Sequence, residues 1–231
     1  MRENMKILGI EKVSLVDFPS KICAVVFTSG CNMRCPFCHN SEIVYDTVNP
    51  IAEDDVIDYL ISRKNVLDGV CVSGGEPTLQ SDLIDFIRKI KGLGFAVKLD
   101  TNGTNPDVLQ KLINANLLDY VAMDIKTCFD QYPHACGLNA RVDNIKHSLD
   151  IMHNSHVPYE LRTTIVKEIH TLQSIEKLAN DLDGEDILYL QHFRDNDTNI
   201  HPGLHEVSIT LAEQYQQILS KHIKCVKLRG Y

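Results

Sequence analysis

The sequence predicts an α/β fold, a partial (β/α)6 TIM-like barrel, from three observations. Six short apolar runs that are rich in β-branched residues alternate with segments of helical periodicity. The runs are continuously hydrophobic, which is typical of parallel strands that helices cover on both faces. Polar motifs follow the ends of these runs, where parallel β/α folds place their ligand sites.

The six β/α units of this fold can be placed along the chain. The expected strands are Ile22–Thr28, Val70–Ser73, Ala96–Thr101, Tyr120–Ile125, Tyr159–Val166 and Ile187–Phe193. The expected helices are Ala52–Lys64, Gln80–Lys91, Asp107–Ala115, Asn139–Asn154, Ser174–Leu182 and Ser208–Lys221. In the second helix, Leu83, Phe86 and Ile87 are three and four residues apart and form an apolar stripe. No repeat or linker interrupts the series, so we expect one domain over residues 1–231.

The composition argues against several classes of protein. Of the 231 residues, 44% are hydrophobic and 23% are charged, as in ordinary globular proteins. The net charge of −8 argues against a nucleic-acid partner, because binding phosphates needs clustered Lys and Arg. No apolar run approaches the ~18–20 residues that cross a bilayer, and the N-terminus lacks the apolar core of a signal peptide. We therefore expect a cytoplasmic protein with no nucleic-acid or membrane partner.

Three of the eight cysteines form the most informative motif. Cys31, Cys35 and Cys38 lie in the expected loop 29–40 at x3 and x2 spacing, and no fourth cysteine completes the run. In a reducing cytosol, clustered thiols favour metal binding or catalysis over disulfides. Three thiolates can hold three irons of a [4Fe–4S] cluster and leave the fourth iron open to a small molecule. A closed Cys3His zinc site with His39 is the alternative, although a chain of this size needs no zinc to fold.

The cysteine motif resembles the cluster-binding loop of the radical S-adenosylmethionine (SAM) superfamily, and the resemblance covers almost the whole chain. It implies that the three cysteines hold a [4Fe–4S] cluster and that SAM is the co-substrate. Phe37 occupies the aromatic position before the third cysteine, which implies that its ring lies against the adenine of SAM.

The segment after the second expected strand, Gly74-Gly75-Glu76-Pro77, is similar to the GGEP motif of the same superfamily. The two glycines let the backbone come close to a ligand, and Pro77 suits the first turn of the following helix. Glu76 can accept a hydrogen bond from the methionine ammonium group of SAM. By itself this tetrapeptide is also a common turn.

Other segments are similar to the activating enzymes of glycyl-radical proteins, and within them to the activating protein of anaerobic ribonucleoside-triphosphate reductase. Among these segments are Asp17-Phe18-Pro19 and Glu160–Thr164. The resemblance implies reductive cleavage of SAM at the cluster to a 5′-deoxyadenosyl radical, which takes a hydrogen atom from a glycine of the reductase. It also implies an electron donor such as flavodoxin or ferredoxin.

Five polar residues at the ends of later strands complete the expected site. They are Asp100, Asn102, Asp124, Lys126 and Arg162. Arg162 can bind the SAM carboxylate bidentately through its guanidinium. The resemblance places Asp124 and Lys126, from the fourth strand, near SAM or the target protein. We expect Asp100 and Asn102, after the third strand, to line the SAM pocket. Ion pairs within the protein and a routine Asn-Gly turn are the alternative explanations.

Alternative functions remain open at this point. One alternative is that the chain activates another glycyl-radical enzyme, of the pyruvate formate-lyase type. Another is that it acts on a small molecule, as the 7-carboxy-7-deazaguanine synthases do. Asp17-Phe18-Pro19 and Glu160–Thr164 favour a protein target. A non-catalytic zinc or electron-transfer module is the alternative from a different class. Cys128 and Cys136 are expected to be loop thiols, with a redox or metal role as the alternative.

Overall fold

The computed structural model describes residues 5–137, 140–196 and 199–231. Within these described residues, eight strands are hydrogen-bonded in chain order, from β1 to β8. The chain divides into two compact units. Unit 1 comprises Met1–Cys31, Glu42–Ala122 and Asp143–Pro158, and unit 2 comprises Asn32–Ser41, Met123–Val142 and Tyr159–Tyr231.

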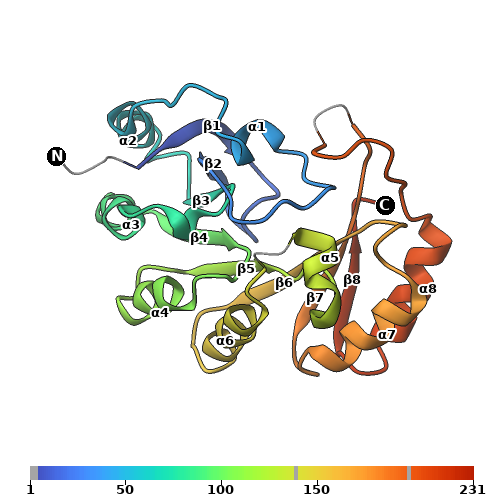
Figure 1. The fold of residues 1–231 in the computed structure, drawn as a ribbon. Helices are drawn as coiled ribbons and strands as arrows, with labels where there is room; N and C mark the ends of the chain where they lie inside the picture. The colour runs from blue at the N-terminus through green and yellow to red at the C-terminus, as the bar shows by residue number, and fades with distance from the viewer. Residues whose placement is uncertain (1–4, 138–139, 197–198) are drawn as a thin grey trace. The chain divides into compact units, whose positions relative to one another are not determined.

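Unit 1 holds the first strands of the chain (Figure 1). Their bounds are β1 (Ile7–Ser14), β2 (Cys23–Thr28), β3 (Gly69–Gly74) and β4 (Ala96–Thr101). β1 pairs with β2 in antiparallel fashion, whereas β2 with β3 and β3 with β4 are parallel pairs. β5 (Tyr120–Asp124) begins in unit 1 and ends in unit 2. The register sets Thr28 opposite Gly74, so the carboxyl ends of β2 and β3 lie side by side.

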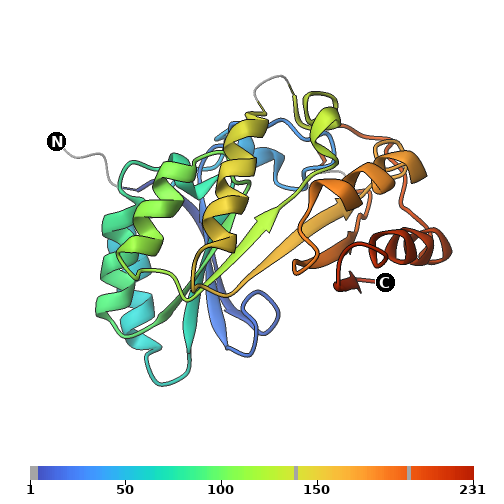
Figure 2. The same ribbon diagram turned by 90° about the horizontal axis from the view of Figure 1, so that it is seen from below.

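Amphipathic helices connect these strands, and Figures 1 and 2 show α2, α3 and α4 following one another along them. The helices are α1 (Ser41–Val44), α2 (Glu53–Ser62), α3 (Leu83–Gly92), α4 (Pro106–Asn114) and α6 (Val142–His153). In α3, Leu83, Phe86 and Ile87 are buried, because their spacing puts them on one face of the helix. α4 begins with Pro106, whose fixed φ suits the first helical position.

A small apolar cluster packs inside unit 1. It consists of Phe18, Cys23, Val25 and Cys71. Both cysteines are fully buried, as expected of small apolar side chains within strands. Burial raises the pKa of the Cys23 thiol to about 11, so this cysteine stays protonated and unreactive.

Unit 2 holds the last strands, which are parallel to one another. They are β6 (Tyr159–Ile165), β7 (Ile187–His192) and β8 (Cys225–Arg229). The helices are α7 (Leu172–Asp181) and α8 (Ile209–Leu219), which pack together, and the short η2 (Phe129–Gln131) and α5 (Tyr132–Cys136). α7 starts with a capping box, in which Thr171 and Ser174 satisfy each other's backbone N–H groups.

The expected α/β architecture with parallel strands is confirmed, and two strands are added to it. β1 and β8 are absent from the sequence prediction, because each is half exposed and lacks a continuous apolar run. The helix expected from Gln80 begins at Leu83, because the 3₁₀ turn η1 (Pro77–Leu79) precedes it. Asn139, the expected first residue of another helix, lies outside the described residues. The single domain over residues 1–231 stays a prediction.

None of the helices in the described residues combines the length and the apolar character that crossing a membrane requires.

Candidate functional site

The turn after β3 needs its two glycines because it touches the chain just before the cysteine motif. A Cβ on Gly75 would lie 1.9 Å from the Gly30 carbonyl oxygen, and one on Gly74 would lie 2.3 Å from the Thr28 nitrogen. Gly74 also has a φ of +117°, which L side chains rarely adopt. The Gly75 N–H donates to the Thr28 carbonyl at 3.0 Å, and the Glu76 N–H donates to the Gly30 carbonyl at 2.8 Å. The glycines thus allow backbone to meet backbone, and their approach to a ligand stays a prediction.

Glu76 is fully buried and collects hydrogen-bond donors from the ends of two elements. Its Oε1 accepts from the Thr78 N–H at 3.1 Å, from the Thr78 hydroxyl and from the Thr101 hydroxyl at 2.7 Å. Its Oε2 accepts from the Asn102 N–H at 2.6 Å. Burial raises the pKa of Glu76 in spite of these bonds. Through these hydrogen bonds, Glu76 fixes the turn after β3 to the end of β4. Pro77 is the first residue of η1, as expected.

The Asn102 side chain points its amide nitrogen at Cys31. Its Oδ1 accepts from the N–H and the hydroxyl of Thr104 at 3.0 and 2.6 Å. These two donors fix the orientation of the amide, and Nδ2 then donates to Cys31 Sγ at 3.8 Å. Hydrogen bonds to cysteine sulfurs are one way in which proteins set the reduction potential of an iron–sulfur cluster. The sequence predicts Asn102 at the site, but not this contact with a cysteine 71 residues away.

Asp100 is paired within unit 1. Its Oδ1 accepts from Lys98 Nζ, and its Oδ2 accepts from the Ser73 hydroxyl at 3.1 Å. Lys98 is only 2% exposed, and its Nζ also lies 3.7 Å from Cys71 Sγ. Asp100 therefore balances a buried cation, and its place in the SAM pocket stays a prediction.

Cys35 and Cys38 lie in a tight turn of unit 2. The Cys38 N–H donates to the Cys35 carbonyl at 3.0 Å. The segment after β7 supports this turn, because the Ile200 N–H donates to the Cys38 carbonyl at 3.2 Å and the His201 N–H to the Pro36 carbonyl at 2.9 Å. These backbone partners leave no signal in the sequence and could not be predicted from it.

Phe37 and His39 flank the third cysteine. The Phe37 ring is buried, and its contact with adenine stays a prediction. The His39 ring packs on Phe193 with centroids 5.6 Å apart, and Asn196 Nδ2 lies 2.9 Å from His39 Nδ1. His39 therefore contacts the segment after β7, and these contacts account for the position of its ring without a zinc ion.

The sulfur of Cys35 has a partner thiol. Cys136 hydrogen-bonds it and lowers the pKa of Cys35, burial acts in the opposite direction, and the Lys126 ammonium lowers the pKa further. Burial raises the pKa of Cys38. The pKa of Cys35 is thus lower than that of an ordinary thiol, and the thiolate is the form of cysteine that binds metals.

Asp124, at the end of β5, binds both Lys126 and Arg162. Arg162 Nε donates to Asp124 Oδ1 at 2.7 Å, and Lys126 Nζ donates to Oδ2 at 2.9 Å. Burial raises the pKa of Asp124, but the two cations outweigh it and hold this pKa well below its usual range. Burial lowers the pKa of Lys126, but Asp124 together with the sulfurs of Cys35 and Cys136 raises it above its usual range. The three residues form an ion triad of net positive charge, which suits a carboxylate ligand.

His170, which the sequence analysis does not single out, holds the backbone of Lys126. Its Nδ1 accepts from the Val166 N–H at 2.9 Å, so Nε2 carries the proton and donates to the Lys126 carbonyl at 2.9 Å. The Lys126 N–H in turn donates to the Tyr132 hydroxyl at 2.9 Å. Burial lowers the pKa of His170 to about 4, so the ring is neutral at pH 7. A lone histidine 44 residues from its partner gives no sequence signal.

The cysteine motif fits an iron–sulfur cluster by its donor chemistry. None of the eight cysteines is in a disulfide, and sulfur is the ligand that these clusters take. Within the residues that the structure describes, no group of three or more His, Cys, Asp or Glu side chains is already gathered around a metal position. The fit therefore rests on three thiols within one short segment and on the positive charge near Cys35, not on a preformed cage.

Known proteins with similar sequences identify the family. The model of a family described as the radical SAM superfamily matches residues 25–182. A candidate glycyl-radical enzyme activating enzyme of Methanocaldococcus jannaschii is 39% identical over 199 residues, which cover 82% of this chain and 80% of that protein. The pyruvate formate-lyase-activating enzyme of Clostridium pasteurianum is 32% identical over 187 residues, which cover 76% of this chain and 75% of that enzyme.

Solved structures share the fold at lower identity. SuiB of Streptococcus suis, bound to S-adenosylmethionine, has a TM-score of 0.64 at 15% identity, over 87% of this chain and 48% of that one. Archaeal TYW1 has a TM-score of 0.53 at 17% identity, over 87% of this chain and 72% of that one. The chain thus spans about half the length of the SuiB chain. Membership of the superfamily implies SAM and an iron–sulfur cluster. The chain belongs to the radical SAM superfamily, among its glycyl-radical enzyme activating enzymes.

Proposed function

We propose that this protein is an activase that cleaves SAM reductively and generates a glycyl radical on anaerobic ribonucleoside-triphosphate reductase. The observation that carries the proposal is the motif of Cys31, Cys35 and Cys38 without a fourth cysteine, in a chain of the activating-enzyme family. The segments that resemble the reductase-activating proteins, Asp17-Phe18-Pro19 and Glu160–Thr164, support this target.

The cysteines are proposed to hold a [4Fe–4S] cluster with one iron open to SAM. When bound, the cluster supplies the electron that splits SAM into methionine and a 5′-deoxyadenosyl radical. Cys35 contributes a thiol whose pKa is lowered by the hydrogen bond from Cys136 and by the Lys126 ammonium. Asn102 donates to Cys31 Sγ and thereby stabilises negative charge on that sulfur.

The ion triad is proposed to bind the carboxylate of SAM. Arg162 donates from its Nε to Asp124, and a guanidinium is the side-chain group that binds carboxylates in a bidentate manner. Lys126 adds a second positive charge, and His170 fixes its backbone. Asp124 keeps both cations in place before the ligand arrives, which lowers the cost of ordering them on binding.

The residues around the GGEP turn are proposed to bind the other groups of SAM. Glu76 Oε2, which takes the Asn102 N–H, can accept a second hydrogen bond from the amino group. Gly74, Gly75 and Pro77 are proposed to contact SAM through their backbone. Asp100 and Asn102 are proposed to line the SAM site, and Phe37 is proposed to contact the adenine. The electron donor is proposed to be a flavodoxin or ferredoxin.

A second candidate target is pyruvate formate-lyase. The similarity to the activating enzyme of Clostridium pasteurianum, over 76% of this chain, favours it. Both targets use the same SAM chemistry, so only the partner protein distinguishes them.

The test is an anaerobic activation assay with both candidate partners. We expect about four irons per reconstituted chain, as one [4Fe–4S] cluster requires, and 5′-deoxyadenosine that forms only with a reductant. With the reductase added, a glycyl-radical doublet should appear in the electron paramagnetic resonance spectrum. SAM cleavage with a doublet only on pyruvate formate-lyase would favour the second candidate, and no doublet on either protein would contradict both.

Cysteine variants make this assay specific to the motif. Cys31→Ser, Cys35→Ser and Cys38→Ser should each reduce 5′-deoxyadenosine formation to the background, because an iron loses its ligand. Cys225→Ser, at the start of β8, is the matched control and should retain the wild-type iron content. Equal activity of the motif variants and the control would overturn the assignment of the ligands.

A further inference from the structure

Unit 2 contains a second cysteine beside the cluster cysteine Cys35. Cys136 is the last residue of α5, and its thiol hydrogen-bonds the Cys35 sulfur. The backbones also meet, because the Arg34 N–H donates to the Cys136 carbonyl at 3.0 Å. The two thiols are therefore neighbours in the fold, although a hundred residues separate them in the sequence.

The surroundings hold these two thiols in place. Cys35 is 6% exposed and Cys136 is 1% exposed, so neither is a mobile surface thiol. Gly137, with a φ of +89°, ends α5 directly after Cys136.

We propose that Cys35 and Cys136 form a reversible disulfide when the chain lacks its iron–sulfur cluster and meets dioxygen. The disulfide takes one ligand out of the cysteine motif, so the oxidised chain cannot assemble the cluster until a thiol reductant restores it. Cys136 is then a redox-sensing partner of the motif rather than a structural loop thiol. The inference rests on the proposed role of Cys35 as a cluster ligand.

The chemistry of this step balances with dioxygen as the oxidant. Two thiols lose two protons and two electrons and form one S–S bond, and dioxygen takes up both protons and both electrons as hydrogen peroxide. A dithiol reductant reverses the step by thiol–disulfide exchange and is itself oxidised. Bound iron keeps Cys35 ligated, so the loaded enzyme is expected to be protected from this reaction as long as the cluster is intact.

The test uses the full chain prepared without iron, exposed to air and digested after its thiols have been alkylated. We expect mass spectrometry to find a peptide that links Cys35 to Cys136, and a dithiol reductant to remove it. Iron uptake on anaerobic reconstitution should fall at least tenfold for the air-exposed chain and return after reduction. The disulfide map does not depend on cluster function, so failure of reconstitution in the reduced chain would count against the proposed function alone.

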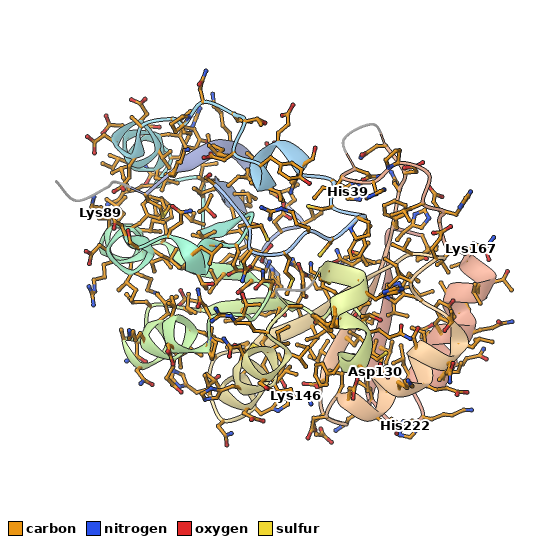
Figure 3. The ribbon with its side chains drawn as sticks, viewed as in Figure 1. His39, Lys89, Asp130, Lys146, Lys167 and His222 are labelled. Atoms are coloured by element: carbon orange, nitrogen blue, oxygen red, sulfur yellow. The ribbon has the colours of Figure 1, made fainter. Side chains whose placement is uncertain are left out.

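Two variants sharpen the test. Cys136→Ser should take up iron after air exposure without any reductant, whereas Cys128→Ser should behave like the wild type. Cys128 is a fair control, because it lies in the same unit and its thiol donates to Asp130 Oδ1 at 3.0 Å instead of to another sulfur; Asp130 is labelled in Figure 3. A dominant link between Cys35 and Cys31 or Cys38, or no disulfide at all, would overturn the inference. Reductant-dependent iron uptake by Cys136→Ser would do the same.

Discussion

The two units organise their predicted site residues by different physics. In unit 1, close backbone packing at Gly75 and neutral donors on Glu76 set the geometry, and a neutral amide faces Cys31. In unit 2, formal charges set the geometry, because Asp124 binds two cations and the Lys126 ammonium lowers the pKa of Cys35. Unit 1 should therefore be sensitive to side-chain volume. Unit 2 should be sensitive to charge and to acid.

The largest effect is expected from volume in unit 1. Gly75→Ala puts a Cβ 1.9 Å from the Gly30 carbonyl oxygen, so the backbone must move. We expect the free energy of unfolding to fall by about 3 kcal/mol or more, as in severe overpacking. Denaturant unfolding measures it. Gly92→Ala is the control, because its Cβ would meet nothing within 4 Å, and equal losses in the two variants would refute the packing argument.

Acid should act on unit 2 through His170. Its pKa in the folded protein is lowered to about 4. Between the ordinary pKa of histidine and pH 4, the unfolded chain therefore binds a proton at this residue and the folded chain does not. Stability is therefore full above the ordinary pKa of histidine and falls by about 3 kcal/mol across the window from pH 6.5 to pH 4. His170→Gln should flatten this slope in denaturant titrations. His222→Gln, an exposed residue labelled in Figure 3, should not.

Charge in unit 2 can be tested at Asp124. Asp124→Asn leaves Lys126 and Arg162 close together without their shared carboxylate, and we expect a loss of about 2 kcal/mol in the free energy of unfolding. Affinity for SAM, measured by calorimetry, should fall as well, because the cations are no longer held in place. Asp130→Asn is the matched control, because its pair with Lys177 is solvent-exposed and should show no measurable change. Equal stability of both variants would contradict the distinction.

The smallest effect is expected at Asn102, and it is a redox effect. Asn102→Asp keeps an oxygen for Thr104 but replaces the N–H that faces Cys31 with negative charge. The reduction potential of the reconstituted cluster should become more negative. Spectroscopic redox titration measures it, with Asn105→Asp as control, because the Asn105 amide donates to the Thr78 carbonyl. An unchanged potential in Asn102→Asp would show that the amide does not act on the sulfur.

The sequence predicts the elements of the fold better than the contacts of the site. The strand Ala96–Thr101 is found at its predicted bounds, because glycine-containing segments on both sides mark its ends. β1 and β8 are missed, because half-exposed strands resemble loops in a single sequence. The motifs identify the family, since Cys31-x3-Cys35-x2-Cys38 requires no structure to recognise.

Contacts between distant residues are what the sequence lacks. The association of Asp124 with Lys126 follows from their spacing, but the join to Arg162 depends on which strands meet. Likewise, no local pattern announces that His170 caps the Lys126 carbonyl or that Cys136 meets Cys35. Each of these contacts depends on the register of strands and on the paths of loops, and neither is encoded within one short window.

The two glycines after β3 also bear on when, relative to folding, the chain can take up iron. The chain at residues 28–30 takes its shape from hydrogen bonds with Gly75 and Glu76, which the ribosome adds only later. A nascent chain that ends before this turn has its cysteines but lacks the backbone that directs them. Iron loading is therefore expected to follow the pairing of β2 with β3, so that cofactor insertion is a late step of biogenesis rather than a seed for folding.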